Sequence, residues 1–241
     1  MPPVQASKKA RILSVVSAKG GVGKTTITAN LGVLLAKEHK LKTLIIDADL
    51  DLPTLGFHLD LIDPDISLHD VLKGKFAINQ AVHAYDYGLH IIPGSVSEEN
   101  APVKEIKNEI AQLATQYDII LLDTVPCMDE GLKNIAGASD EILIVTSPDL
   151  PSMTASLKAV KLSRNLGIPV RGVVLNKVRR KNYELSSSDV GSALGAQVLA
   201  SIPEDPKVYE ALFEKKPVVL YAPKSPASGE LRKLADAIAK D

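Results

Sequence analysis

The segment from Lys19 to Thr26 constrains this chain more than any other, because it reads Lys-Gly-Gly-Val-Gly-Lys-Thr-Thr and lies between two contrasting stretches. An apolar, β-branched run at residues 12–16 precedes it, and a helical pattern follows it from residue 24. In a glycine-rich turn between a strand and a helix, backbone N–H groups point inward and the helix dipole adds positive potential. The sequence therefore predicts a loop that binds a polyphosphate.

The side chains at the end of this loop fit the same chemistry. Lys24 is placed to reach the terminal phosphates, and the Thr25 hydroxyl is placed to join a Mg²⁺ shell. The strict form of the motif has glycine at the position of Ala18, which this chain lacks. Instead a second lysine, Lys19, stands at the mouth of the loop.

The rest of the chain alternates apolar runs with amphipathic stretches, which is typical of parallel strands joined by crossover helices. We expect an α/β fold with a mostly parallel central sheet flanked by helices. The predicted strands are residues 12–16, 43–47, 89–92, 119–123, 142–145, 172–175 and 197–201, and the predicted helices are 24–38, 102–116, 132–138, 153–166, 206–214 and 229–240. With 241 residues, 45% of them hydrophobic, we expect one domain over 1–241, with 1–10 as a flexible N-terminal segment.

Composition excludes several classes of protein. The formal net charge of −1 gives no global basic field, so nucleic acid is not the default partner. The single cysteine, Cys127, excludes an internal disulfide framework and fits a reducing compartment. No apolar run is long enough to cross a bilayer, and the N-terminus lacks an apolar signal region. We therefore expect a cytoplasmic protein.

Acidic residues stand where two predicted strands end. Asp123 closes the apolar run 119–123, a placement suited to holding Mg²⁺, although a strand-terminal aspartate is often only a cap for the next segment. Asp47 and Asp49 are two residues apart, so their carboxylates face the same side of an extended segment. A solvated acidic loop is the alternative, and it fits Asp51 better than the other two.

Residues 176–179 read Asn-Lys-Val-Arg and resemble the guanine-reading motif Asn-Lys-x-Asp except at the last position. Guanine needs a carboxylate acceptor there, whereas Arg179 has only donors, so guanine is disfavoured. The Asn176 amide can still pair with adenine. We interpret the basic residues 179–181 as a solvated turn rather than a nucleic-acid site, because no aromatic stack accompanies them.

The phosphate loop with its extra lysine, together with these acids, resembles the deviant-Walker ATPases that include MinD and ParA, a SIMIBI-class group of P-loop NTPases. The archaeal MinD-type members are the most similar. The resemblance implies that Lys19 crosses a dimer interface to the partner's nucleotide, whereas the alternative is a solvated lysine that adds general positive potential. It also implies that Asp49 orients or activates the attacking water, and that Asp47 supports the magnesium shell.

The same resemblance implies ATP and Mg²⁺ as ligands. The catalytic set is Lys19, Lys24 and Asp49, and the metal set is Thr25, Asp47 and Asp123. The turn at residues 202–206 resembles the family loop whose backbone lines the adenine. The nucleotide-binding set is Lys19, Gly20, Gly21, Val22, Gly23, Lys24, Thr25, Thr26, Asn176, Pro203, Glu204 and Asp205.

The function implied is an ATP-dependent switch. ATP brings two copies together, a protein partner is recruited, and slow, dimerisation-dependent hydrolysis resets the monomer, for MinD-like control of cell division or of the positioning of cellular components. A ParA-like DNA or cargo partitioning ATPase is an alternative that the near-neutral charge does not favour. A metal-cofactor insertion ATPase is a further alternative, but this chain lacks the cysteine pairs usual in that class. A small-molecule kinase is another, but the chain has no arginine-rich lid segment.

Two segments depart from the family pattern. After Asp123 the family has Pro, a small residue and Gly, whereas here Pro126 is displaced and Cys127 stands at the expected glycine. This predicts a different backbone path or weakened hydrolysis, with a redox or metal role for Cys127 as the alternative.

The C-terminal stripe, formed by Leu231, Leu234, Ala235, Ile238 and Ala239, is the second departure. It is poor in the bulky apolar and basic residues of bacterial MinD membrane helices. We expect a helix that packs on the core, with weak or indirect membrane contact.

Overall fold

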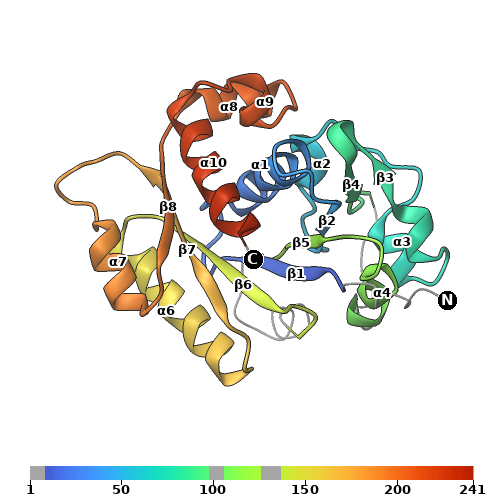
Figure 1. Ribbon diagram of the computed structural model, residues 1–241, viewed down its shortest axis with the longest axis horizontal. Coiled ribbons are helices and arrows are strands. Elements are labelled where there is room, and N and C mark those ends of the chain that lie inside the picture. Colours follow the sequence, from blue (N-terminus) through green and yellow to red (C-terminus); the bar gives the residue numbers. More distant parts are fainter. Residues whose placement is uncertain (1–8, 98–105, 126–136, 241) are drawn as a thin grey trace, which may run out of the picture.

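The computed structural model describes residues 9–97, 106–125 and 137–240. Within them an eight-stranded sheet has the order β3-β4-β2-β5-β1-β6-β7-β8 (Figure 1). Neighbouring strands are parallel except β3 and β4, which pair antiparallel. The strands are β1 (Arg11–Val16), β2 (Thr43–Asp47), β3 (His83–Ala84), β4 (Leu89–Ile92), β5 (Ile119–Asp123), β6 (Glu141–Thr146), β7 (Val170–Val178) and β8 (Val198–Pro203). The predicted mostly parallel α/β fold is confirmed.

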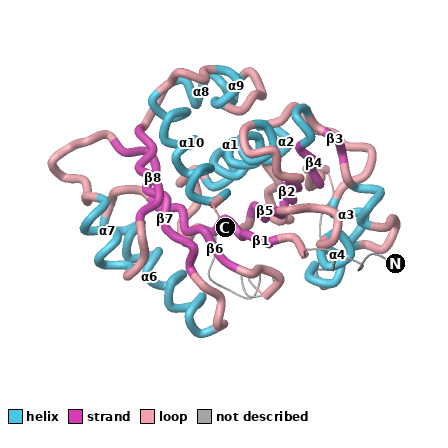
Figure 2. Tube along the Cα trace, viewed as in Figure 1, coloured by secondary structure: helices cyan, strands magenta, loops and turns pink. Residues whose placement is uncertain are grey.

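Helices cover both faces of this sheet, so the molecule has three layers (Figures 1 and 2). One face carries α1 (Lys24–Lys37), α2 (Leu55–His58), α8 (Pro206–Phe213), α9 (Val218–Tyr221) and α10 (Pro226–Ala239), and the other carries α3 (Leu68–Leu72), α4 (Ile106–Leu113), α6 (Leu150–Asn165) and α7 (Ser187–Leu194). Strand β1 shows why both faces are apolar. Its Leu13 and Val15 join the core under α1, whereas Ile12 and Val16 join the cores on the opposite face.

The parallel strands bring the predicted acids together at one edge. Asp47 at the end of β2 is the register partner of Asp123 at the end of β5. Val15, near the end of β1, also pairs with Asp123, so the loop that follows β1 starts beside both carboxylates. In open α/β sheets this carboxyl edge is where ligands bind.

Helix α10 packs on the core, as its apolar stripe predicts. Leu234 and Ile238 are fully buried, and the helix lies against α1 and β8. Two guanidinium groups hold its last turn, because Arg11 donates to the carbonyl oxygen of Ile238 and Arg171 donates to that of Ala237 at 2.6 Å. Cations at a helix C-terminus satisfy free carbonyls and complement the helix dipole.

Some predicted boundaries are wrong. Strand β7 runs to Val178, which pairs with Pro203, so Asn176 lies within the strand rather than after it. Helix α7 was not predicted because its sequence is rich in serine, yet Ser186 and Asp189 form a capping box that starts it. The short elements α2, α3, α9 and β3 span too few residues to show a period.

Two predicted helices fall partly outside the described residues. The prediction for 102–116 is represented by α4, and its residues 102–105 are not described. The prediction for 132–138 lies outside the described part of the chain up to residue 136. The altered segment with Pro126 and Cys127 also lies outside it.

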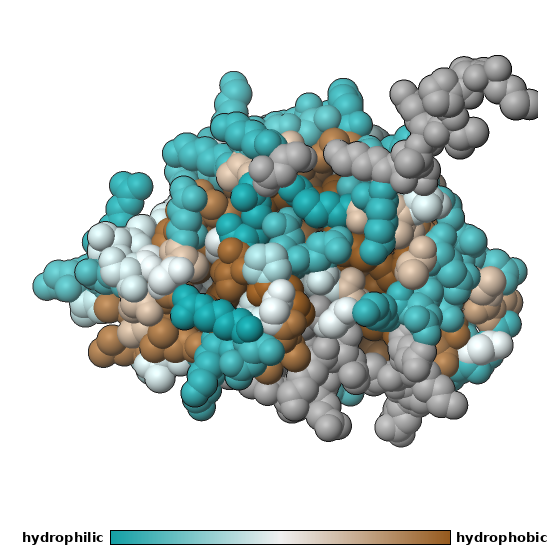
Figure 3. Space-filling view, turned by 60° about the horizontal axis from the view of Figure 1, so that its bottom comes forward, coloured by the Kyte–Doolittle hydropathy of each residue, from teal (hydrophilic) through white to brown (hydrophobic). Residues whose placement is uncertain are grey.

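Among the described helices, none combines the length and the apolar character needed to cross a membrane. On the face shown in Figure 3, hydrophobic side chains lie in small groups between hydrophilic ones.

Candidate functional site

The loop between β1 and α1 has the backbone that its glycines predict. Gly21 and Gly23 have φ angles of 76° and 96°, in the left-handed region that glycine adopts most easily. A Cβ on Gly23 would lie 2.4 Å from Nδ2 of Asn176, so a side chain there would displace the asparagine. Asn176 Nδ2 also donates to the carbonyl oxygen of Val22 at 2.7 Å, and Lys177 Nζ donates to that of Gly21 at 2.7 Å. Strand β7 therefore fixes the loop from the side.

The first turn of α1 is prepared for an anion. Gly23 occupies the N-cap position, and within the described structure no side chain caps the helix and no acidic residue lies in its first turn. The backbone N–H groups of a first turn have no partner inside the helix. The combination leaves free donors and a positive dipole end facing the loop.

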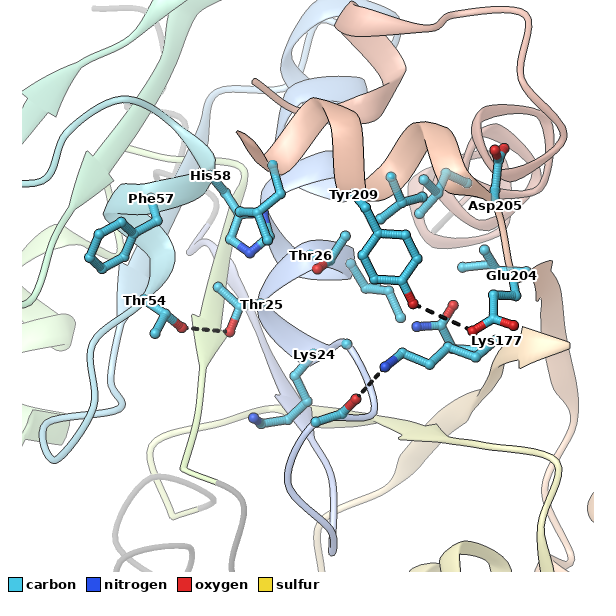
Figure 4. Close-up of a pocket in the computed structure, with 18 of the residues that line it drawn as sticks. Lys24, Thr25, Thr26, Thr54, Phe57, His58, Lys177, Glu204, Asp205 and Tyr209 are labelled. Atoms are coloured by element: carbon cyan, nitrogen blue, oxygen red, sulfur yellow. Dashed lines mark hydrogen bonds between the residues drawn. The ribbon is translucent and has the colours of Figure 1, made fainter. Parts of the chain in front are cut away.

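A cavity of about 480 Å³ opens at this point (Figure 4). The loop and the start of α1 form one side, α2 and the loop before it form the second, and the end of β8 with α8 forms the third. Its lining includes Gly21, Gly23, Lys24, Thr25, Thr26, Asp49, Asn176, Pro203, Glu204 and Asp205. Ten predicted site residues therefore meet around one space, although they come from distant parts of the sequence.

The basic and acidic groups of the site lie close to the sheet edge. Lys24 is only 7% exposed, and Asp123 is completely buried. One oxygen of Asp123, Oδ1, accepts from the Thr28 hydroxyl at 3.2 Å, while Oδ2 has no hydrogen-bond partner among the described residues. Asp47 is also completely buried, and its carboxylate accepts from two backbone N–H groups. An uncompensated buried carboxylate oxygen beside a phosphate-type loop fits a divalent cation.

Burial governs how these acids titrate. It raises the pKa of Asp47 well above its usual range, and the neighbouring Asp123 raises it further. It raises the pKa of Asp123 to about 6, against the opposing effects of the Lys24 ammonium and of the nearby Thr25 and Thr28 hydroxyls. The pair is therefore poorly stabilised as two anions, and a bound cation would compensate that charge.

Asp49 lies at the cavity wall, two residues beyond Asp47. It is 9% exposed, and its Oδ1 accepts from the backbone N–H of Leu52 at 3.1 Å. Burial raises its pKa, whereas that hydrogen bond and Lys24 lower it. One carboxylate oxygen remains to contact a ligand or water in the cavity.

Lys19 does not line this cavity. Its Nζ lies 3.4 Å from the Ser152 hydroxyl and 3.7 Å from Asp149 Oδ1, at the start of α6. Half of its side chain is exposed, at 52%. The extra lysine thus points away from the loop that carries it.

The far end of the cavity is built by the turn after β8. Glu204 forms an ion pair with Arg179, with Nη2 and Oε1 3.0 Å apart, and accepts from the Tyr209 hydroxyl at 3.4 Å. The Asp205 carboxylate caps α8 by accepting from the N–H of Lys207 at 2.9 Å. Arg179 therefore belongs to the frame of this turn.

Eleven of the described lining residues were not in the predicted set, and five of these carry polar or aromatic groups. Thr54, Phe57 and His58 come from α2 and the loop before it, Tyr209 from α8, and Lys177 from β7 (Figure 4). Burial lowers the pKa of His58 to about 4, so this imidazole is neutral near pH 7. Only Lys177 had a visible signal, since it stands beside Asn176 in the motif.

Comparisons with known proteins agree with this geometry. Residues 13–218 match the family described as the CobQ/CobB/MinD/ParA nucleotide binding domain. An uncharacterized ATP-binding protein of Methanocaldococcus jannaschii is 32% identical over 231 residues, which cover 95% of this chain and 88% of that protein.

Two solved structures are similar over nearly their whole length. The cell division ATPase MinD of Pyrococcus furiosus has a TM-score of 0.91 at 33% identity, covering 96% of this chain and 99% of that one. The septum site-determining protein MinD of Pyrococcus horikoshii, complexed with Mg-ADP, has the same TM-score and identity and covers 96% of both chains. The chain therefore belongs to the CobQ/CobB/MinD/ParA family of nucleotide-binding proteins, and its resemblance to archaeal MinD-type members is confirmed.

Proposed function

We propose that this chain is an ATP-dependent dimerising switch. It binds ATP with Mg²⁺, closes against a second copy, recruits a protein partner and returns to the monomer through slow hydrolysis. The observation that carries the proposal is the uncapped N-terminus of α1, which faces a cavity lined by Lys24 and Asp49, with the buried carboxylates of Asp47 and Asp123 at the same sheet edge. The relative solved with Mg-ADP supports the choice of ligands.

In this proposal residues 19–26 hold the phosphates through backbone N–H groups. Lys24 binds the terminal phosphates, and Thr25 holds Mg²⁺ together with Asp123, while Asp47 supports the metal shell. The bound Mg²⁺ would supply charge neutralisation between phosphate oxygens. Among the described residues, no three or more carboxylate, histidine or cysteine side chains are arranged so that they alone could hold a metal ion. A site that relies on one or two carboxylates and on phosphate oxygens suits Mg²⁺.

We propose that Asp49 orients the attacking water. It lines the cavity, and its carboxylate is fixed on one side by the N–H of Leu52. Phosphate hydrolysis depends mostly on positioning and charge stabilisation, so a correctly held carboxylate suffices.

The base is proposed to lie at the far end, where Asn176, Pro203, Glu204 and Asp205 meet. Adenine is favoured over guanine because Arg179 offers no acceptor and is already paired with Glu204.

Lys19 is proposed to act on the nucleotide of a second copy. Its Nζ lies against the start of α6 and outside its own cavity, where it is half exposed and contacts Ser152 and Asp149, so it would exchange these contacts for the partner's nucleotide. A cation delivered in trans stabilises the transition state, as arginine fingers do, and such groups are worth roughly 10³ to 10⁵ in rate. Hydrolysis would then depend on dimerisation.

The test is size-exclusion chromatography with light scattering, with and without ATP and Mg²⁺, beside a phosphate-release assay. The parent should form dimers only with ATP, and Lys19→Ala should lose both dimers and turnover while it still binds ATP. Lys158→Ala, which removes an exposed lysine from α6, is the matched control. Dimers and parent-like turnover in Lys19→Ala would refute the shared site.

For the cell, we propose a role in the spatial control of division or of the positioning of components. The protein would work in the cytoplasm, with membrane contact at most weak or indirect, since α10 buries its apolar stripe in the core. We also propose one ATPase domain over residues 1–241, because the strands of the described residues form one eight-stranded sheet.

A further inference from the structure

His69 is a buried histidine that joins two loops at the carboxyl edge of the sheet. It lies in α3 and is 0% exposed. Its Nε2 lies 3.0 Å from the carbonyl oxygen of Leu50, in the loop after β2, and the N–H of Ser95, after β4, lies 3.1 Å from its Nδ1. Both ring nitrogens are therefore engaged with backbone, one from each loop.

These two partners determine the tautomer of the ring. A backbone N–H can only donate, so Nδ1 must be the bare acceptor for Ser95. A carbonyl oxygen can only accept, so Nε2 carries the hydrogen that Leu50 receives. The imidazole thus bridges the loops with one acceptor and one donor used in fixed directions.

The helix that carries His69 is itself held in place. Ser67 and Asp70 form a capping box at the start of α3, and the N–H of Leu68 donates to the carbonyl oxygen of Pro93 at 2.8 Å. The two loops also touch directly, since a Cβ on Gly94 would lie 2.4 Å from the Cβ of Pro53. Hydrogen bonds and close packing therefore join the helix that carries the imidazole to the loops around it.

The bridged carbonyl belongs to the residue directly after Asp49. The loop is attached before it, where the N–H of Ala48 donates to the carbonyl oxygen of Asp123 at 2.8 Å, and after it, where the N–H of Leu55 donates to Asp47 at 2.9 Å. Between these ends, the Leu50 carbonyl is held from behind by His69. This carbonyl belongs to the peptide group that joins Leu50 to Asp51, and the N–H of Asp51 in the same group lowers the pKa of Asp49 by hydrogen bonding, so a rotation there would alter the surroundings of the Asp49 carboxylate.

We propose that His69 is a positioning residue for hydrolysis, because it fixes the Leu50–Asp51 peptide group in the loop that carries Asp49 and so keeps that carboxylate aimed into the cavity. This inference rests on the proposed role of Asp49. It assigns His69 no contact with nucleotide or metal, so its effect should fall on turnover and not on ATP binding.

The experiment uses the full chain with saturating ATP and Mg²⁺. His69→Phe removes both ring nitrogens, and we expect kcat to fall about 10- to 100-fold while the Kd for ATP changes less than about threefold, since small misplacements of a catalytic group are costly. His69→Gln keeps an amide acceptor and donor and should recover most of the loss. His83→Phe is the matched control, because Nε2 of His83 also meets a carbonyl oxygen, that of Ile66 at 2.8 Å, which lies outside residues 48–55.

Two further measurements separate positioning from simple loss of stability. In hydrogen exchange, residues 48–55 should lose protection in His69→Phe while β1 and α1 keep theirs. In an Asp49→Ala background, His69→Phe should lower kcat no further, because it acts through that carboxylate. If His69→Phe does not fold, His69→Met, which fills the space flexibly without either hydrogen bond, replaces it in all assays.

The outcomes distinguish this inference from the proposed function. If Asp49→Ala reduces turnover but His69→Phe and His69→Met keep the parent kcat, the inference is wrong and the function stands. An equal loss in His83→Phe would also overturn it. If Asp49→Ala itself keeps the parent kcat, the assigned role of Asp49 fails and the inference fails with it.

Discussion

Replacing Asp123 by asparagine should stabilise the nucleotide-free protein and weaken its binding of ATP with Mg²⁺. The substitution keeps the shape of the side chain and an oxygen that can accept from the Thr28 hydroxyl. It removes a buried charge whose Oδ2 has no hydrogen-bond partner in the described residues and which lies beside Asp47. The Asp123 carboxylate thus lowers the stability of the nucleotide-free protein and contributes to binding of ATP with Mg²⁺.

The size of the effect follows from the pKa of Asp123, which burial raises from 3.8 to about 6. The folded state then holds its proton more tightly than the unfolded chain, so the free energy of unfolding falls as the pH rises from about 4 to about 6 and stays low above that. A rise in pKa of roughly two corresponds to a loss of about 2–3 kcal/mol in the free energy of unfolding at pH 7.5. For a chain of this size that is a rise in Tm of about 4–12 °C in Asp123→Asn.

The assay is thermal unfolding of nucleotide-free parent and variant at several pH values between 4.5 and 7.5, with calorimetric binding of ATP and Mg²⁺ at pH 7.5. The variant should gain most at pH 7.5, and the gain should shrink toward pH 4.5. Its ATP affinity in the presence of Mg²⁺ should fall at least about tenfold, as expected when a metal contact is lost. A variant less stable than the parent at pH 7.5, or a gain that does not vary with pH, would refute the reasoning.

Two other substitutions test the loop and the C-terminal helix. Gly23→Ala should weaken ATP binding at least about tenfold, because a left-handed backbone costs other residues roughly 1–2 kcal/mol and the new Cβ displaces Asn176. Calorimetry checks this against Gly229→Ala, where a Cβ has open space in α10 and parent-like affinity is expected; parent-like affinity in Gly23→Ala would contradict the prediction. Leu234→Ala should cost about 2–5 kcal/mol and lower Tm by about 4–20 °C, because Leu234 is fully buried. Leu150→Ala, at a side chain that is 62% exposed, should change Tm little, and equal losses in both variants would show that burial is not the cause.

The sequence predicts the phosphate loop and the strand-end acids because their chemistry is local. Gly21 and Gly23 indicate a backbone with positive φ, and Asp123 indicates the end of a buried strand. The parallel sheet then brings Asp47 and Asp123 together through register alone. For these residues, local sequence spacing and the rule that parallel strands bring their carboxyl ends to one edge are sufficient to predict the site.

The walls of the cavity are different, because they depend on tertiary contacts between short or distant segments. His58 belongs to a helix of only four residues, which carries no periodic signal. The hydrogen bond from Asn176 to Val22 joins residues 154 positions apart, and the motif around Asn176 indicated a base contact rather than a support for the loop. His69 shows no motif at all, since both of its partners are backbone groups of other segments.

Helix α10 contributes Leu231 to the cavity wall while its other apolar residues anchor it to α1 and β8. Any ligand that packs on Leu231 must therefore disfavour detachment of this helix. By linkage, a loosened helix must lower the affinity for that ligand. At a hundredfold excess over Kd the mutual stabilisation is worth about 2.7 kcal/mol if the detached form cannot bind. A fusion or label near residue 239 that strains the helix would then be measured as poor nucleotide affinity, although it lies remote from every phosphate contact.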